Sequence, residues 1–202
     1  MQQTQQLHRK QVVFIHGGEA FDTREAYLEY LREQTAENPF GSEDSSGWKH
    51  GLQEALGEEY AVAHLSMPCP KNAKYDEWKL WFNKYVPFFE DGIIFIGHSL
   101  GANFLAKCLG ECTLPAKAAQ LYLVAGCFGT EGGFRINGEL LCVEAQVEEV
   151  YIYHSQDDEV VSYEHAQRYK KAIPKAKLRT FKDRGHFLGE EFPELVKNIR
   201  TR

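Results

Sequence analysis

The chain has 202 residues, of which 43% are hydrophobic and 26% charged, and its formal net charge is −6. This size and composition predict one globular domain with a substantial core over residues 11–202, after a disordered polar tail over residues 1–10. The acidic balance, without a long block of lysine and arginine, argues against a nucleic-acid partner held by phosphate contacts. No hydrophobic run is long enough to span a bilayer and the first residues lack a signal peptide's apolar centre, so we expect no membrane partner and a cytoplasmic location.

The cysteines are spread along the chain without a CxxC pair, at Cys69, Cys108, Cys112, Cys127 and Cys142. Cys108 and Cys112 lie four residues apart in a helical pattern, where two thiols would share one face. No second pair of metal ligands accompanies them, so a metal site is disfavoured. We therefore expect buried free thiols in a reducing compartment, and neither a metal nor a cofactor.

Short hydrophobic runs alternate with longer amphipathic segments. The runs predict strands at residues 12–17, 60–68, 93–97, 119–126, 150–155 and 177–181. The amphipathic segments predict helices at residues 23–37, 48–56, 75–89, 100–109, 163–172 and 193–200. Residues 38–47 are predicted to form an exposed loop, and residues 127–145 fit a loop, a hairpin or a small cap equally well.

Strands that are hydrophobic on both faces and alternate with helices are typical of an α/β protein. They predict a mainly parallel sheet of about six strands, with helices on both faces. In such sheets, ligands bind at the carboxyl ends of the strands. Functional side chains are therefore to be sought just after each hydrophobic run.

The strongest motif is Gly97-His98-Ser99-Leu100-Gly101, which joins a fully hydrophobic run to a helix-forming segment. G-x-S-x-G between strand and helix is typical of a nucleophile elbow. In this turn the serine backbone is strained, and the two glycines let neighbouring backbone approach closely. The start of a helix also favours negative charge that develops near the serine. The competing interpretation is a glycine-bounded turn whose serine caps the helix.

A serine hydroxyl is a poor nucleophile at neutral pH unless a base lies next to it. Among the eight histidines, His186 follows the strand at residues 177–181 in the turn DRGHF, where a flexible glycine would let it reach the elbow. His98 adjoins Ser99 in sequence, but an elbow would aim its side chain elsewhere. His165 falls within a helical pattern and fits a solvated helix face. His186 is therefore the candidate base.

The base needs an acid that fixes its tautomer and stabilises its protonated form. Asp157 and Asp158 both follow the strand at residues 150–155. Local physics does not choose between them, because a shift of one residue reverses the direction that each carboxylate faces. One of them would equally serve as a cap for the next helix. The chain order of serine, aspartate and histidine is the order found in α/β-hydrolases.

An oxyanion hole would complete the site. The backbone N–H of Leu100, after the nucleophile, supplies one donor, and the loop HGGEAF after the first strand supplies the other, most simply through Gly18. The competing interpretation of HGG is a strand-ending turn. Aromatic residues that could line an acyl pocket, with helix packing favoured for the two tryptophans, are Phe21, Trp78, Trp81, Phe128 and Phe187.

Taken together, the stretches HGG, GHSLGA, SQDDEVVS and DRGHF resemble the α/β-hydrolase superfamily, over about residues 12–199. The short chain, the absence of a lid insertion and the ending GHFLGEEFPELVKNI resemble more narrowly the small serine hydrolases of the retinoblastoma-binding protein family. In that family the acid begins the pattern D-P-x-V/L-P. The resemblance therefore implies Asp158 as the acid, with Asp157 in reserve, although Glu159 and Ser162 replace the two prolines. The HGG loop also departs from the family's glycine-rich first loop.

The residues and the resemblance predict a carboxylesterase-like serine hydrolase with a minimal cap. It would cleave a small ester or thioester through an acyl-enzyme, with Ser99, His186 and Asp158 as the triad and with Leu100 and Gly18 as the oxyanion donors. Two alternatives stay open. One is a protein-interaction module on a hydrolase scaffold, because the family resemblance implies a protein partner. The other is a lyase that uses the same triad on a cyanohydrin-type substrate.

Overall fold

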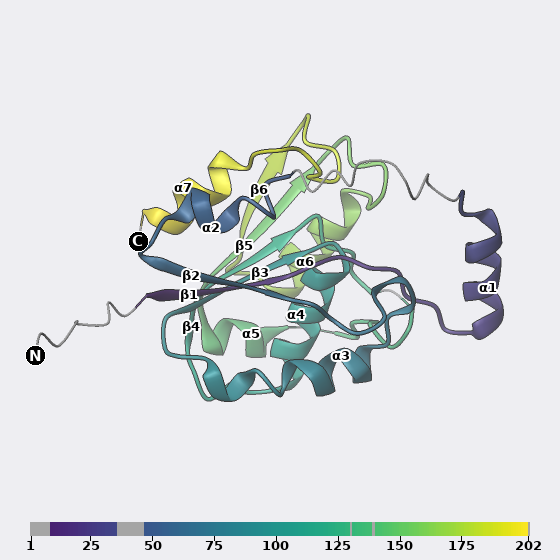
Figure 1. Cartoon of the computed structure of the whole chain (residues 1–202), viewed down its shortest axis with the longest axis horizontal. Helices are drawn as coiled ribbons and strands as arrows, with labels where there is room; N and C mark the ends of the chain where they lie inside the picture. Colours follow the sequence, from purple (N-terminus) through teal and green to yellow (C-terminus); the bar gives the residue numbers. More distant parts are fainter. Residues whose placement is uncertain (1–8, 36–46, 130, 139, 202) are drawn as a thin grey trace, which may run out of the picture.

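Six strands form one sheet in the computed structural model, which describes residues 9–35, 47–129, 131–138 and 140–201 (Figure 1). Their order is β2-β1-β3-β4-β5-β6, and every neighbouring pair is parallel. The strands are β1 (Lys10–Ile15), β2 (Tyr60–Leu65), β3 (Ile93–His98), β4 (Ala118–Val124), β5 (Val147–Ser155) and β6 (Lys177–Phe181). The predicted α/β fold with a six-stranded parallel sheet is confirmed.

Helices cover both faces of this sheet. They are α1 (Arg24–Glu33), α2 (Leu52–Leu56), α3 (Tyr75–Phe82), α4 (Leu100–Glu111), α5 (Leu141–Gln146), α6 (Glu164–Ala172) and α7 (Pro193–Arg200). The core cluster of one face contains residues of α3 to α6, and the cluster of the other face contains residues of α2 and α7. Figure 1 shows α1 standing away from both layers, at the end of the molecule opposite the start of β1.

Several element boundaries differ from the predictions. The helix predicted over residues 75–89 ends at Phe82, and a 3-10 turn at Val86–Phe88 follows it, with Pro87 near the start of that turn. The helix predicted over residues 48–56 begins only at Leu52, after Gly51. In the stretch 127–145, for which the sequence favours no single structure, the last residues form part of α5. Residues 1–8 of the predicted tail and 38–46 of the predicted loop lie outside the described residues, and β1 begins at Lys10, a residue assigned to the tail.

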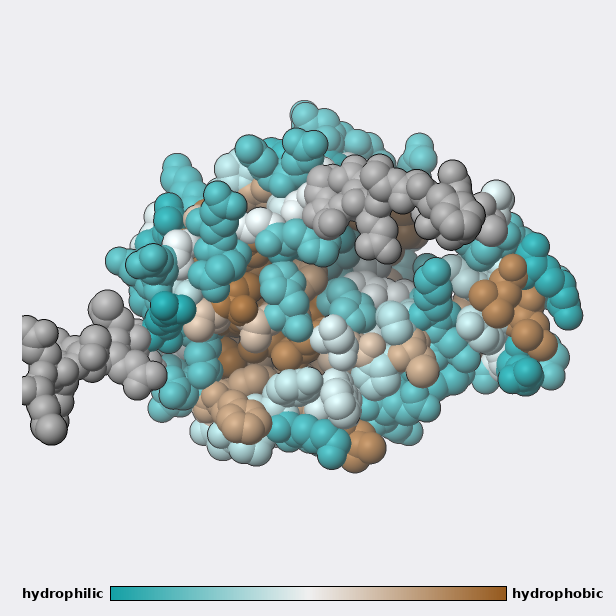
Figure 2. Space-filling model, viewed as in Figure 1, coloured by the Kyte–Doolittle hydropathy of each residue, from teal (hydrophilic) through white to brown (hydrophobic). Residues whose placement is uncertain are grey.

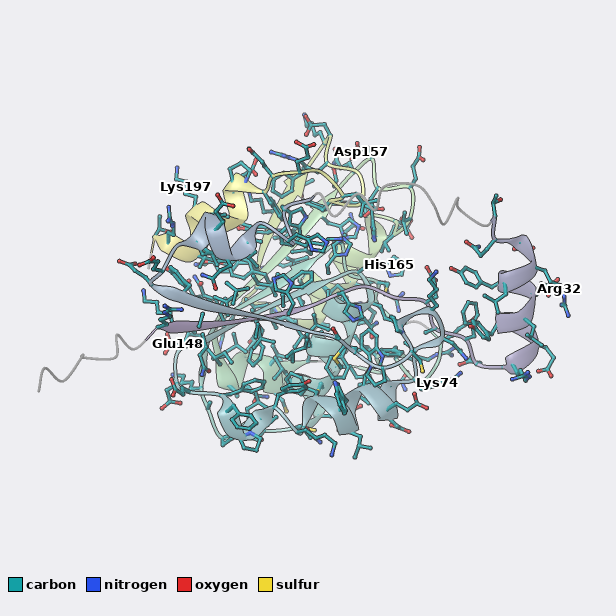
Figure 3. The ribbon with its side chains drawn as sticks, viewed as in Figure 1. Arg32, Lys74, Glu148, Asp157, His165 and Lys197 are labelled. Carbon is teal, nitrogen blue, oxygen red and sulfur yellow. The ribbon has the colours of Figure 1, made fainter. Side chains whose placement is uncertain are left out.

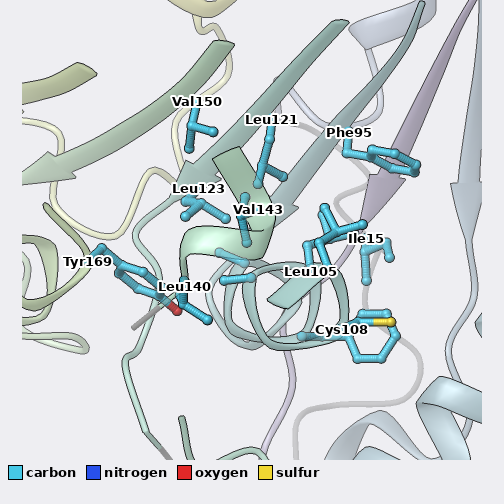
Figure 4. Packing of buried hydrophobic residues seen from close by; sticks show 14 of the residues in the cluster. Ile15, Phe95, Leu105, Cys108, Leu121, Leu123, Leu140, Val143, Val150 and Tyr169 are labelled. Atoms are coloured by element: carbon cyan, nitrogen blue, oxygen red, sulfur yellow. The ribbon is translucent and has the colours of Figure 1, made fainter. Parts of the chain in front are cut away.

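The four inner strands are buried on both faces because alternate side chains feed two separate cores, whereas the edge strands β2 and β6 are partly exposed. In β3, for example, Ile93 and Phe95 join the core under α3 to α6, while Ile94 and Ile96 join the core under α2 and α7. Figure 4 shows the first core, where Leu105 of α4 packs beneath the sheet. Helix α4 is buried along most of its length. It is therefore held firmly at the centre of the fold, and it begins directly after Ser99.

A polar cluster ties α3 to α4. Glu111 accepts a hydrogen bond from the Tyr75 hydroxyl at 2.6 Å and pairs with Lys79 and Lys107, each at 3.0 Å. Burial by itself raises the pKa of Glu111, but the hydrogen bonds from Tyr75, Lys107 and Lys79 outweigh it and hold that pKa at about 2. The cluster therefore stabilises the helix that carries the elbow.

The cysteines are free, as predicted, but the prediction that they are buried is wrong for four of the five. Cys108 alone is fully buried, inside α4. Cys69 and Cys142 are exposed, because Cys69 lies in a loop after β2 and Cys142 on the outer side of α5, and Cys112 and Cys127 are partly buried. No helix within the described ranges combines the length and the apolar character that crossing a bilayer requires.

Helix α1 contributes no fully buried side chain to either core. Phe21 contacts Tyr27 and Tyr30 of this helix, with ring centroids 5.5 and 5.1 Å apart. Leu31 is 41% exposed, and Figure 2 shows hydrophobic surface on this helix at the right of the view. The helix is therefore an outlying element beside the edge where the strands end.

Candidate active site

Ser99 occupies the sharp turn between β3 and α4. Its backbone has φ 55° and ψ −120°, and residues other than glycine rarely adopt a positive φ. The Ser99 N–H donates to the Val124 carbonyl at 2.9 Å, which anchors the turn to the end of β4. The structure therefore has the strained strand-to-helix turn that the sequence motif predicts.

The two glycines of the motif are required by close contacts. A Cβ on Gly97 would lie 2.6 Å from the Ala102 backbone, and a Cβ on Gly101 would lie 2.3 Å from the Ile15 carbonyl oxygen. Both distances are shorter than real carbon contacts allow. The glycines therefore let α4 start directly against the ends of β3 and β1, which explains their symmetric placement around Ser99.

Backbone strain is concentrated at this end of the sheet. Among the described residues, the non-glycine residues with positive φ are Cys69, Ser99, Ala125 and Phe187. Each of them lies in a segment that follows a strand: β2, β3, β4 and β6 respectively. Such strain persists where surrounding contacts enforce it, and it is typical of functional sites.

Asp158 and His186 meet directly. His186 Nδ1 lies 2.9 Å from Asp158 Oδ2 and 3.1 Å from Oδ1. The Asp158 carboxylate is fully buried, and the N–H groups of Val160 and Val161 each donate to Oδ1 at 2.9 Å. Because a carboxylate accepts hydrogen bonds, His186 donates from Nδ1, and this tautomer leaves Nε2 free to accept a proton.

Asp157 faces the other way. It is exposed, and Figure 3 shows it on the loops beyond the strands, away from Glu148 near the start of β5. Its carboxylate accepts hydrogen bonds from the Ser155 hydroxyl and from the Gly185 N–H, the latter at 3.0 Å. The hydrogen bond from Ser155 is the main cause that lowers the pKa of Asp157. Asp157 therefore holds the backbone of the histidine loop and does not contact the imidazole.

His98 links the elbow to the histidine loop. Its Nε2 lies 2.8 Å from the His186 carbonyl oxygen, and the two rings are in edge contact with centroids 4.8 Å apart. The carbonyl can only accept, so His98 Nε2 carries the proton. Burial lowers the pKa of His98 well below its usual value, which keeps the ring neutral. As predicted, its side chain points away from the position of a base. The sequence does not predict its contact with the His186 carbonyl.

The histidine loop is held at further points on either side of His186. The Arg184 N–H donates to Ser155 Oγ at 3.0 Å, and the Arg184 guanidinium pairs with Glu194 at 2.6 Å. On the far side, the Trp48 indole N–H donates to the Phe187 carbonyl at 2.8 Å. These contacts fix the loop beside the elbow. Ser99 Oγ makes no hydrogen bond to another described residue.

The loop after β1 lies against the elbow. A Cβ on Gly17 would lie 3.0 Å from Ser99 Cβ, and a Cβ on Gly18 would lie 3.4 Å from the Leu100 side chain. Within the described ranges, the N–H groups of Gly18 and Leu100 donate no hydrogen bond, whereas the Glu19 N–H donates to the Pro70 carbonyl at 2.8 Å. The loop that carries Gly18 is thus in contact with Leu100, and neither N–H has a partner among the described residues.

Two interactions near the site are not predicted by the sequence: that of Glu19 with His186, and that of His165 with Phe128. Burial raises the pKa of Glu19, and the nearby His186 opposes this rise, so an acidic side chain lies within electrostatic reach of the proposed base. His165 was expected on a solvated helix face, but it is half-buried and its Nδ1 accepts the Phe128 N–H at 2.8 Å. No sequence pattern distinguishes either contact.

The aromatic residues considered for an acyl pocket are mostly structural. Trp78 is fully buried among Phe104 and Phe134, and Phe187 is 3% exposed. The packing role favoured for Trp78 is the one observed, while Trp81 is 38% exposed on α3. Among the described residues there is no group of three or more His, Cys, Asp or Glu side chains placed to hold a metal ion.

This fold, with a strained serine elbow and an aspartate–histidine pair at the carboxyl edge of the sheet, defines the class of α/β-hydrolases. A model of the family described as serine hydrolase matches residues 40–193. The chain therefore belongs to the serine hydrolase family. The narrower resemblance to the retinoblastoma-binding protein family stays a prediction.

Solved structures of similar fold agree with this class. The ydeN gene product from B. subtilis is 18% identical, with a TM-score of 0.70 over 95% of this chain and 97% of that chain. A serine hydrolase involved in carbazole degradation, the CarC enzyme, is 16% identical, with a TM-score of 0.63 over 94% of this chain and 88% of that chain. The esterase domain from a Rhodothermus marinus protein is 17% identical, with a TM-score of 0.58 over 97% of this chain and 84% of that chain. A search among curated proteins found no match.

Proposed function

We propose that the chain is a carboxylesterase-like serine hydrolase that cleaves a small ester or thioester. The observation that carries this proposal is the buried Asp158 carboxylate on His186 Nδ1, 2.9 Å away, at the same edge of the sheet as the strained Ser99. The esterase domain among the similar structures has the same fold. The small substrate and the cytoplasmic location are expectations from the sequence.

In the proposed mechanism, Ser99 Oγ attacks the acyl carbonyl while His186 Nε2 takes the hydroxyl proton. The N–H groups of Leu100 and Gly18 bind the oxyanion that forms. When the tetrahedral intermediate collapses, His186 gives the proton to the leaving alkoxide or thiolate. Water, deprotonated in turn by His186, then releases the acyl group and restores Ser99. Asp158 holds the imidazole in the tautomer that both steps need.

Covalent labelling with a fluorophosphonate probe tests the nucleophile. We expect the wild type to be labelled and Ser99→Ala to remain unlabelled. Ser162→Ala is the matched control, because Ser162 is an exposed serine in the loop after Asp158 and its loss should leave labelling unchanged. A folded wild type that is not labelled would contradict the proposal and favour an interaction module. Labelled protein would then be assayed on short-chain p-nitrophenyl esters, with product analysis to separate hydrolysis from lyase chemistry.

A further inference from the structure

The Asp158 carboxylate lies between two imidazoles, and the proposed triad uses only one of them. His186 Nδ1 is 2.9 Å from Asp158 Oδ2, and His154 Nε2 is 3.6 Å from the same oxygen. The side chains of His154 and Asp158 are both 0% exposed. His154 belongs to β5, the strand that leads into the acid loop. A buried imidazole so close to a buried carboxylate acts on it strongly, because little water screens the pair.

The protonation state of His154 follows from its partners. Its Nε2 lies 2.8 Å from the Val161 carbonyl oxygen, which can only accept, so Nε2 carries a proton. Its Nδ1 is buried and has no partner among the described residues. Burial lowers the pKa of His154. The Val161 carbonyl and the Asp158 charge oppose this shift, while His165 and His186 add to it. His154 is therefore a neutral ring with its N–H directed at the acid loop.

The hydrogen bonds of the carboxylate leave one side for this ring. Oδ1 accepts the N–H groups of Val160 and Val161 at 2.9 Å each and also lies 3.1 Å from His186 Nδ1. Within the described residues, Oδ2 has His186 as its one partner at hydrogen-bond distance. A buried carboxylate oxygen with unused acceptor capacity is costly. The His154 Nε2–H donates to the Val161 carbonyl at 2.8 Å, and the positive end of this N–H dipole lies 3.6 Å from Oδ2, beyond hydrogen-bond distance.

The His154 N–H holds the acid loop through Val161. Val161 donates its N–H to Asp158 and accepts from His154 through its carbonyl, so both sides of one peptide segment are fixed. Val161 is itself 7% exposed and packs into the protein. The position of the Asp158 carboxylate is thus set from inside the sheet by His154, and from outside by the loop's own N–H groups.

We propose that His154 is a positioning residue for Asp158, which sets the carboxylate on His186 Nδ1 by clamping the acid loop at the Val161 carbonyl. This inference rests on the proposed function only in its kinetic consequence. The arrangement of His154, Asp158 and His186 can be tested in a protein that turns over no ester at all.

The test compares His154→Phe, which keeps an aromatic ring but removes the donor, with His154→Gln, whose side-chain amide can reach the Val161 carbonyl. The first measurement is the downfield proton NMR signal of the His186 Nδ1–H, which reports the Asp158 contact without any turnover. We expect this signal to be lost or displaced in His154→Phe and retained in His154→Gln. Where the wild type hydrolyses p-nitrophenyl esters, kcat should fall by about 10- to 100-fold in His154→Phe with KM nearly unchanged, and His154→Gln should recover most of it.

Two further measurements separate positioning from a general loss of structure. The acid limb of the kcat–pH profile should move to lower pH in His154→Phe, because the protonated His186 loses part of its carboxylate contact. In an Asp158→Asn background, the addition of His154→Phe should lower kcat by less than about 2-fold. The reason is that the effects of residues that act through one another are not additive. If His154→Phe does not fold, His154→Asn, whose shorter amide cannot reach Val161, replaces it.

The proposal is overturned if His154→Phe leaves the His186 signal and kcat as in the wild type. It is equally overturned if His154→Gln fails in the same way as His154→Phe, or if the losses from His154→Phe and Asp158→Asn simply add, since His154 would then be a packing residue. A wild type that shows the His186 signal but is not labelled at Ser99 would refute the proposed function and leave the positioning result standing.

Discussion

Replacing Asp158 by asparagine should move the imidazole proton of His186 from Nδ1 to Nε2, because the structure fixes how the new amide must lie. Oδ1 of Asp158 accepts two backbone N–H groups, from Val160 and Val161, each at 2.9 Å. An amide NH2 cannot occupy that place without facing two donors, so the amide oxygen takes it. The NH2 group then replaces Oδ2 and faces His186 Nδ1. His186 must present a bare Nδ1, and its proton moves to Nε2, the atom that should accept the Ser99 proton.

The expected loss is on the order of 10⁴-fold in kcat, which corresponds to roughly 5.4 kcal/mol of transition-state stabilisation. The assay is kcat on a short-chain p-nitrophenyl ester, normalised to the concentration of sites labelled by a fluorophosphonate. The geometry is otherwise conserved in Asp158→Asn, so KM should change little. The melting temperature checks that the variant is folded.

Asp157→Asn is the matched control. The Asp157 carboxylate accepts from the Ser155 hydroxyl and the Gly185 N–H, and an amide oxygen can accept both bonds while its NH2 group points to solvent. Its kcat should therefore stay within about 3-fold of the wild type, a small change relative to the loss of the triad acid. A large loss in Asp157→Asn together with a nearly active Asp158→Asn would refute the reasoning and exchange the two roles.

Gly18→Ala should cost about 10²- to 10³-fold in kcat by displacing an oxyanion donor, because its Cβ would lie 2.4 Å from the Pro70 carbonyl oxygen. Gly51→Ala, with no atom within 4 Å of its Cβ, should leave kcat unchanged, and equal activity of the two variants would argue against Gly18 as a donor. Glu111→Gln should lower the free energy of unfolding at pH 7 by about 1 kcal/mol, since solvent screens a side chain that is 41% exposed. The pKa of Glu111 is depressed to about 2 from 4.5, so this difference should be complete above pH 4.5 and vanish as the pH falls toward 2. Urea unfolding at several pH values measures it, and a difference that stays constant down to pH 3 would contradict the assignment.

The sheet was predictable from the sequence because the inner strands are hydrophobic on both faces, a pattern that a parallel sheet imposes. Ser99 was predictable because the elbow demands glycines at fixed offsets, and the 2.6 and 2.3 Å approaches at Gly97 and Gly101 are the reason. The choice between the two aspartates was not predictable from local sequence, because it depends on how the chain bends after β5. The structure brings Asp158 to His186 and turns Asp157 toward Gly185.

Other parts of the site depend on contacts between distant segments, which no local pattern encodes. His98 meets a carbonyl 88 positions further along the chain, and the direction of that contact follows from the packing of two loops. The sequence does not predict a role for His154, because a histidine near the end of a buried strand is usually a core residue whose hydrogen bonds are made within the core. The structure of residues 127–145 does not follow from the sequence, because the glycines there allow several backbone conformations. Tertiary contacts determine which of them forms.

The residues with positive φ at the ends of the strands have a consequence for how this protein could change. Glycine, which adopts such backbone angles freely, would relax the backbone at Cys69, Ser99 and Ala125, whereas at Phe187 it would also remove a buried ring. At Ser99 that relief removes the hydroxyl itself. Relief of backbone strain in this chain is therefore available mainly where it risks activity. Substitutions that raise stability without a loss of activity are therefore to be sought toward the opposite end of the sheet, in engineering as in natural selection.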